Sequence, residues 1–423
     1  MIETVKNAWK IPELRKKLTF VLFAIVIYRL GYAIYVPFVD TASLATQFAS
    51  LNSGNLLGYF NTLSGGGFAT ASIFAMSIYP YINSSIIIQL LQVAIPALER
   101  LSKEGGEEGK KKIQRIIRCT TLVLAAIMAF GYYLTLKNVY HVLTRTDAWS
   151  GIVIVLTMVA GSMFVMWLGD QITEKGIGNG ISIILLVGIV SQGFKALSTV
   201  LSLSWWAIIV VVAICLAIIA FIVYITEAER RIPVQYAKRV VGRKQYGGQS
   251  THLPMKVNMS GVMPVIFAST ICGVPATIAG FAQPEQGSFW WNMTNEWFRP
   301  GAVAYIIIYV LLIFAFAYFY STIQFNPIEV ANNMKKNGGF IPGFRPGKPT
   351  SDFIKKVLNK ITMMGAIFLA IIAALPLVLS NVPSLGALAI GGTTTLIMVS
   401  VSLETVRAIE GELMMRHYKG FLE

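Results

Sequence analysis

The sequence predicts an all-α polytopic membrane protein with ten transmembrane helices. Long apolar runs recur along its 423 residues, 55% of which are hydrophobic and only 13% charged, and the mean hydropathy is +0.64. Basic residues cluster between alternate runs, which is the pattern that orients membrane helices. Such a composition is typical of one membrane domain rather than of several soluble ones.

The apolar runs give the positions of the spans, and most reach the roughly 20 residues that a helix needs to cross a bilayer core of about 30 Å. In chain order the spans are expected at about 18–37, 70–97, 113–136, 150–169, 180–200, 205–226, 259–281, 301–324, 360–380 and 386–408. The resulting organisation is an N-terminal tail (1–17), the first five spans (18–200), span 6 (201–226), a loop (227–258), spans 7 and 8 (259–324), a loop (325–359), spans 9 and 10 (360–408) and a C-terminal tail (409–423).

All but five of the 35 Lys and Arg residues lie in, or at the edge of, segments on one side of the predicted membrane. The five are Lys137, Arg145, Lys195 and Arg299 towards the other side, and Arg29 inside the first span. The positive-inside rule therefore predicts that both termini are cytoplasmic. The net charge of +15 either only sets this topology or also attracts anionic lipid, acidic protein or nucleic acid.

The N-terminal tail (1–17) is expected to form an amphipathic helix at the membrane interface. It spaces Ile2, Val5, Trp9 and Leu14 at helical intervals among lysines. An apolar face beside a basic one is the pattern of helices that lie in the interface plane.

The predicted spans offer little chemistry. The three cysteines (Cys119, Cys215 and Cys272) lack metal-ligand spacing and are expected to be small buried hydrophobes without disulfides. The three histidines lie in loops or the tail, and ionisable residues other than Arg29 sit at span ends. Because ion-coupled carriers and intramembrane proteases need such groups near the midplane, we expect no enzyme activity, cofactor or metal site.

Residues 41–69, between the first two spans, fit neither lipid nor an ordinary loop. Within them, 55–64 (NLLGYFNTLS) is half apolar and long enough for about two helical turns. Gly65, Gly66 and Gly67 then stop a helix. Non-helical backbone at membrane depth survives only where protein or a water-filled cavity surrounds it. The pattern favours a re-entrant piece that lines or stops a pore over an amphipathic helix on the outer surface.

The second span, 70–97, carries Pro80 one third of the way along, which predicts a bend in the helix. Ile78 and Ile82 are four residues apart and share one face beside this bend. The uncharged polar residues that follow suit a helix interface or a wet cavity better than lipid. They are Asn83, Ser84, Ser85 and Gln89.

Two long basic loops lie on the cytoplasmic side. Residues 227–258 predict a protruding strand–turn–strand with Arg243 and Lys244 at its tip, and 325–359 ends in a turn-rich stretch that holds Arg345 between Gly-Phe and Pro-Gly. Two structured basic projections suggest docking to a large anionic partner such as ribosomal RNA. The alternative is solvated loops that only set topology.

Four long stretches together resemble the SecY family, the central subunit of the bacterial protein-translocation channel. They are ASIFAMSIYPYINSSIIIQLL (71–91), MWLGDQITEKGIGNGISII (166–184), YAKRVVGRKQYGGQSTHLPMKVNMSGVMPVIFAS (236–269) and FIPGFRPGKPT (340–350). The resemblance implies two pseudo-symmetric five-helix halves around an hourglass pore, whose waist is a ring of aliphatic side chains. Matched motif by motif, the ring would be Ile78, Ile82, Leu185, Ile266 and Ile397. The family commonly has isoleucine where this chain has Leu185, and a sixth ring position is not assigned.

The broken segment corresponds to the plug of that family, within 55–69. Its matched residues are Asn55, Leu56, Leu57, Tyr59, Phe60, Asn61, Leu63, Ser64, Gly65, Gly66 and Gly67. Spans 70–97 and 259–281 would flank a lateral gate into lipid, with Ser84, Ser85, Gln89 and Thr270 as gate residues. Arg243, Lys244 and Arg345 match positions that contact the ribosome and the SecA motor.

The resemblance implies a protein-conducting channel of the bacterial cytoplasmic membrane that moves unfolded secretory chains and releases hydrophobic signal segments sideways into the lipid bilayer. The implied partners are SecE-like and SecG-like membrane subunits, the SecA ATPase and the ribosome. A solute carrier would instead need a midplane site with charged or unwound-helix ligands, and a membrane-anchored scaffold would be a closed bundle without an aqueous path.

Overall fold

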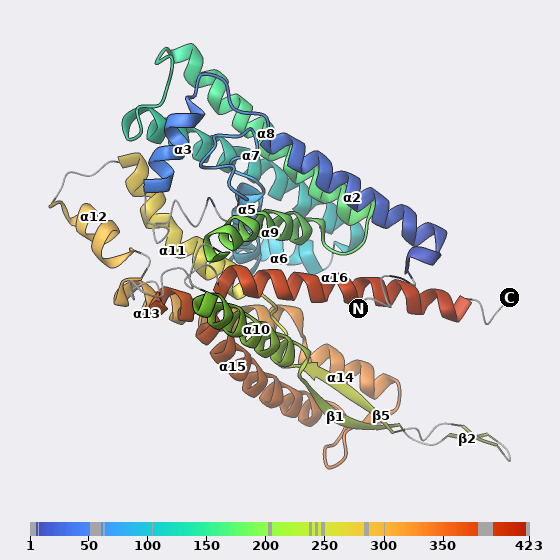
Figure 1. Cartoon of the computed structure of the whole chain (residues 1–423). Helices are drawn as coiled ribbons and strands as arrows, with labels where there is room; N and C mark the ends of the chain where they lie inside the picture. The colour runs from blue at the N-terminus through green and yellow to red at the C-terminus, as the bar shows by residue number, and fades with distance from the viewer. Residues whose placement is uncertain are drawn as a thin grey trace. The chain divides into compact units, whose positions relative to one another are not determined.

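In the computed structural model the residue range of each predicted span overlaps that of a helix (Figure 1). The structure describes residues 6, 8–50, 61, 64–103, 105–201, 205–236, 239–241, 244–246, 250–282, 287–299, 301–379 and 392–419. The long helices are α2 (Pro12–Tyr32), α5 (Tyr79–Ala94), α7 (Gly106–Asn138), α8 (Ala148–Lys175), α9 (Gly180–Leu201), α10 (Trp205–Glu227), α11 (Met263–Ala282), α13 (Val303–Gln324), α15 (Lys348–Leu379) and α16 (Gly392–Lys419).

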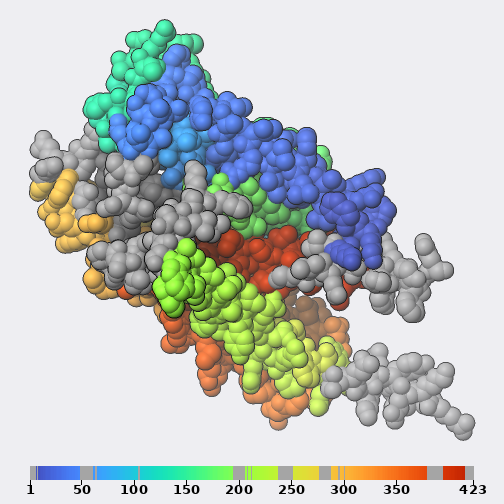
Figure 2. Space-filling model, viewed as in Figure 1, coloured from blue at the N-terminus to red at the C-terminus, as the bar shows by residue number. Residues whose placement is uncertain are grey.

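By length and composition, five helices in the described part of the chain could cross a membrane, or six if α5 and the bent helix after it count as one span. That all ten apolar runs cross therefore stays a prediction. Their outer faces are apolar: Figure 2 shows α10 (yellow-green) at the surface, and its Ile209 and Leu216 are 53% and 61% exposed. An apolar face without a protein partner suits contact with lipid.

The chain divides into two compact units, and the first comprises Met1–Leu203, Gly273–Ala302 and Val401–Glu423. In it α7 packs against both α5 and α8, while α2 and α9 both contact α8. Its shorter elements are α3 (Thr41–Ser50), α6 (Pro96–Lys103), α12 (Phe289–Asn292) and the π-helical turn η1 (Met293–Trp297). A buried core joins the turns around Ala71 and Met76 to Tyr132 of α7 and to Met158 of α8.

The second unit comprises Ser204–Cys272 and Val303–Ser400. Its helices α13 and α15 are held side by side, with the Ser321 and Thr362 hydroxyls 2.7 Å apart. Strand β1 (Glu229–Tyr236) pairs antiparallel with β4 (Ser250–Lys256), and β2 (Arg239–Val241) pairs with β3 (Lys244–Tyr246) further out. The strand–turn–strand predicted for the first basic loop is therefore confirmed.

The two basic loops form one packed body, which the sequence did not predict. The second loop contains α14 (Pro327–Lys336) and β5 (Gly339–Phe340), and β5 pairs with β1 to complete a sheet of order β4-β1-β5 (Figure 1). Side chains of the sheet and α14 share a buried core with the first turns of α15, through Ile232, Met255, Met334, Ile341 and Ile354. Helix α15 begins at Lys348, well before the expected start at 360, because its first turns close this core.

The second span also differs from its prediction. Residues 64–78 are turns apart from an isolated β-bridge between Ser72 and Tyr35, and α5 starts only at Tyr79 with Pro80 in its first turn. Pro80 therefore starts the helix rather than bending it, since a first-turn residue needs no intrahelical N–H bond. The bend lies later, at Ile95, where the helix direction changes by 106° before α6. Ile95 adopts extended backbone because Pro96 follows it.

The expectation that all three cysteines are buried needs correction. Cys272 is buried, but Cys119 and Cys215 are exposed, since they lie on outer faces of helices whose apolar residues need no protein cover. In the N-terminal region Leu14 is buried beside Ile409 of α16, and Lys17 pairs with Glu412 at 2.6 Å, while an interfacial position of the tail stays a prediction. The described part of the tail is thus anchored on the C-terminal helix.

Candidate functional site

The non-helical segment 64–78 is the most unusual backbone in the first unit. Gly65 and Gly66 have φ of 69° and 93°, and Ala71 and Ser77 adopt positive φ although they are not glycines. Backbone of this kind persists only where its surroundings determine it, and it gathers at functional sites. The segment runs directly into ring position Ile78, which precedes α5.

Asn61 organises the start of this segment. Its backbone carbonyl accepts from the Gly66 N–H at 2.8 Å, and its side-chain Oδ1 accepts from the Ala69 N–H at 2.9 Å. The Ser64 hydroxyl donates to the same Asn61 carbonyl and accepts from the Phe68 N–H. Local side-chain bonds therefore satisfy N–H groups that no helix or sheet serves.

A polar cluster fixes the end of the segment. The Tyr28 hydroxyl lies 2.9 Å from the Ser77 hydroxyl and 2.8 Å from that of Tyr32, and the Ser162 hydroxyl donates to the Ser77 carbonyl at 3.1 Å. Tyr28, Ser77 and Ser162 are all buried. Helices α2 and α8 thus hold the residue before Ile78 from two sides.

Helix α9 presents one face to the same segment. Leu185, Gly188 and Gln192 recur at helical spacing, so they share a face. A Cβ built on Gly65 would lie 3.0 Å from Gly188 Cα, and Gln192 Nε2 donates to the Asn61 carbonyl at 3.5 Å. Leu185, one turn earlier, is buried. The matched ring position on α9 therefore lies on the helix face that contacts the end of the matched plug.

The residues that match the ring positions are buried in both units. Ile78, Ile82 and Leu185 belong to the first unit, while Ile266 on α11 and Ile397 on α16 belong to the second. Of the matched plug, the described residues are Asn61, Ser64, Gly65, Gly66 and Gly67; the positions that lie outside the described residues are Asn55, Leu56, Leu57, Tyr59, Phe60 and Leu63.

The matched gate residues differ in their surroundings. The buried Ser84 hydroxyl donates to the Ile117 carbonyl of α7 at 2.8 Å, so it serves the packing of α5 on α7. Ser85 accepts from the Gln89 amide of the same helix. Thr270 is buried, and its hydroxyl has no hydrogen-bond partner among the described residues.

Arg345, one of the matched docking positions, is exposed on a turn that is tied to α15. Its carbonyl accepts a hydrogen bond from the Thr350 hydroxyl at 2.8 Å. The ring centroids of the preceding Phe344 and of Phe353 on α15 are 4.2 Å apart. Lys244 lies in β3, and Arg243 lies outside the described residues. The turn that bears Arg345 is thus tied to α15, and a docking role for Arg345 stays a prediction.

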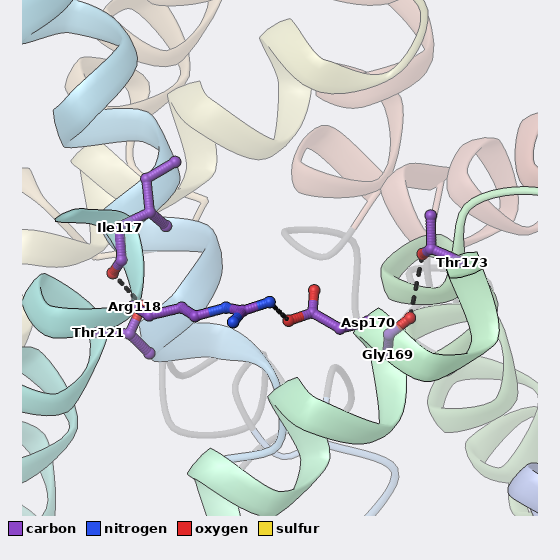
Figure 3. A network of polar contacts seen from close by, with 6 residues as sticks. All are labelled: Ile117, Arg118, Thr121, Gly169, Asp170 and Thr173. Carbon is purple, nitrogen blue, oxygen red and sulfur yellow. Dashed lines mark hydrogen bonds and ion pairs between the residues drawn. The ribbon is translucent and has the colours of Figure 1, made fainter. Parts of the chain in front are cut away.

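Sequence reasoning missed an ion pair beside these elements. Arg118 of α7 donates to the Asp170 carboxylate of α8 at 2.7 Å (Figure 3). The Thr121 hydroxyl donates to the Ile117 carbonyl, which also accepts from Ser84. These contacts tie α5, α7 and α8 together. Asp170 at the end of its span was the available signal, but nothing in the sequence pairs it with Arg118.

Comparison with known proteins identifies the family. A family model described as SecY matches residues 72–406. A protein translocase subunit SecY from Streptomyces scabiei is 43% identical over 441 residues, with both chains fully covered.

Two solved structures share the fold. One, at TM-score 0.66 and 17% identity with 96% of both chains covered, is titled for the SecY plug domain that stabilises the closed translocation channel. The other, at TM-score 0.61 and 16% identity with 96% of both chains covered, is Sec61 in a canine ribosome–channel complex. The family model and the full-length relative establish that this multi-pass membrane chain belongs to the SecY family.

Proposed function

We propose that this chain is the protein-conducting channel subunit of a bacterial Sec translocase, not an enzyme. It moves unfolded secretory chains across the cytoplasmic membrane and releases hydrophobic segments sideways into lipid. The observation that carries the proposal is the contact of Asn61 and Gly65 with the α9 face that bears Leu185. A plug held over an aliphatic constriction is what a resting channel requires.

The aliphatic ring explains how such a channel stays tight without binding its cargo. Ile78, Ile82 and Leu185 of the first unit would be joined by Ile266 and Ile397 of the second. A narrow constriction of branched aliphatic side chains resists wetting and so blocks ions. It makes no directed hydrogen bonds, so it tolerates chains of many sequences. A signal segment leaves through the gate because burying apolar surface in lipid is favourable by about 25 cal/mol per Å².

The partners follow from the basic body of the second unit and from the family. Arg345 and the β2–β3 tip that bears Arg243 and Lys244 would dock a ribosome or the SecA motor from the cytoplasm. The positive-inside distribution supports cytoplasmic termini. SecE-like and SecG-like subunits would cover part of the apolar outer surface, and co-purification with them would distinguish this channel from a solute carrier.

Replacing Ile82 and Ile266 together by Asn should raise resting ion leak and relax discrimination against poor signal sequences. Polar side chains in the constriction would let water connect its two sides. The measurement is ion flux through reconstituted vesicles in the absence of a translocating chain. The double substitution by Val keeps the ring apolar and should stay tight. Equal resting conductance in the Asn variant and the parent would refute the ring assignment.

A further inference from the structure

Arg29 of α2 makes contacts that the proposed function does not yet use. Its Nη2 donates to the Val187 carbonyl of α9 at 3.2 Å, and its Cζ lies 5.5 Å from the centroid of the Tyr32 ring. Its Nη1 lies 3.5 Å from the position that a Cβ on Gly65 would occupy. The Arg29 guanidinium therefore contacts α9 and the Tyr32 ring of its own helix, and it lies beside Gly65 of the matched plug.

These contacts are not needed to complete the helices. Val187 lies inside α9, so its carbonyl already serves the helix ladder and offers Arg29 its second lone pair. Arg29 lies in the last turn of α2, where a cation also interacts favourably with the helix C-terminus. The aromatic ring of Tyr32 and the carbonyl together hold the guanidinium in a fixed place.

Gly65, in the matched plug, lies close to both α9 and Arg29. Gly65 has a φ of 69°, and its missing side chain lets it approach Gly188 as well as Arg29. On the same α9 face, Gln192 contacts the Asn61 carbonyl. Asn61 and Gly65 thus both lie against α9, and Arg29 lies beside Gly65.

We propose that Arg29 is a positioning residue that latches the plug segment against α9 in the closed channel. The inference rests on the proposed function. Arg29 is held in place by α9 and Tyr32. Gly65 must therefore move away from Arg29 when the plug is displaced. Loss of the Arg29 side chain would shift the equilibrium between seated and displaced plug towards the displaced state, without altering the constriction itself.

The test compares Arg29→Gln with the parent in reconstituted vesicles. Resting ion leak should rise roughly tenfold, the change that corresponds to about 1.4 kcal/mol in the closed–open equilibrium. Arg29→Lys keeps the charge but loses the planar fork, so it should restore tightness only in part. Gly65→Ala changes the plug partner of the same contact and should raise resting ion leak as much as Arg29→Gln does. Combining it with Arg29→Gln should add little if both act through one contact.

Arg145→Gln is the matched control, because Arg145 also lies over an aromatic ring, 5.8 Å from the Phe38 centroid, and is exposed. It should leave the leak unchanged. If Arg29→Gln folds, translocates and stays as tight as the parent while the Ile82/Ile266 double Asn variant leaks, the latch is wrong and the channel stands. If the ring variant does not leak and the parent translocates nothing, the proposed function itself fails.

Discussion

At the scale of single residues, α8 shapes the non-helical segment 64–78 through two neighbouring positions. A Cβ built on Gly161 would lie 2.1 Å from the Ile73 carbonyl oxygen, while the next residue, Ser162, donates to the Ser77 carbonyl. Gly161 leaves room for the segment because it has no side chain, and Ser162 binds the segment through a hydrogen bond. Because the obstructing atom is backbone, the helix and the segment cannot both keep their places if a side chain is added.

Gly161→Ala should therefore destabilise the protein by about 1–3 kcal/mol, the typical result of overpacking a filled site. It should also raise resting leak, because residues 73–78 would be displaced. The readouts are thermal unfolding in detergent and ion flux in vesicles. Gly411→Ala on α16 is the control, since an added Cβ there meets nothing within 4 Å and should be neutral or stabilising. Equal stability of the two variants would contradict the close approach.

At the scale of elements, residues 64–78 form a unit that has no helical or sheet hydrogen-bond pattern of its own. Asn61 supplies the acceptors at one end, and the Tyr132 hydroxyl of α7 donates to the Phe68 carbonyl at 2.6 Å in the middle. Buried backbone groups must be paired, so these side chains replace the hydrogen bonds of a helix. The segment is then held by its neighbours, whereas α7 and α8 pack on one another independently of its first residues.

Deleting residues 59–64 should leave a foldable channel that closes less securely. Asn61→Ala should also make closure less secure, but it should destabilise the closed state by only about 1 kcal/mol, because it removes one side-chain hydrogen bond. Purified yield, thermal unfolding and resting ion flux measure the two consequences separately. The matched control is Asn326→Ala, which removes a comparable cap from the Ile328 N–H of α14. A plug deletion as tight as the parent would argue against the plug assignment.

At the scale of the whole molecule, the basic loops are joined in one body with its own core. Strand β1 pairs with β4 from its own loop and with β5 from the other. The exposed Arg345 turn is tied to α15 through Phe344 and Thr350. A partner that docks on this body would thus act on α15 through packed contacts.

Arg345→Glu should weaken docking of the ribosome or SecA by about 10- to 100-fold, the worth of charge-assisted hydrogen bonds to phosphate or carboxylate. Topology should survive because most basic residues of the loop remain. Binding to channel vesicles at several salt concentrations, with protease mapping of topology, provides the measurement. Arg345→Lys should recover only part of the affinity. Arg299→Glu, on the other side of the predicted membrane, is the control. Normal docking by Arg345→Glu would leave this loop a topology signal.

The sequence by itself determined the apolar runs, the likeness to SecY and the antiparallel strands of the first basic loop. These features depend on composition, charge and local periodicity, which are present in a linear chain. Only the tertiary structure decided that Pro80 starts α5, that the second loop adds a strand to the first, and that Ser84 packs on α7. It also brought Arg29, Gly65 and Val187 together. Such outcomes depend on contacts between segments far apart in the chain, whose free energy no local pattern records.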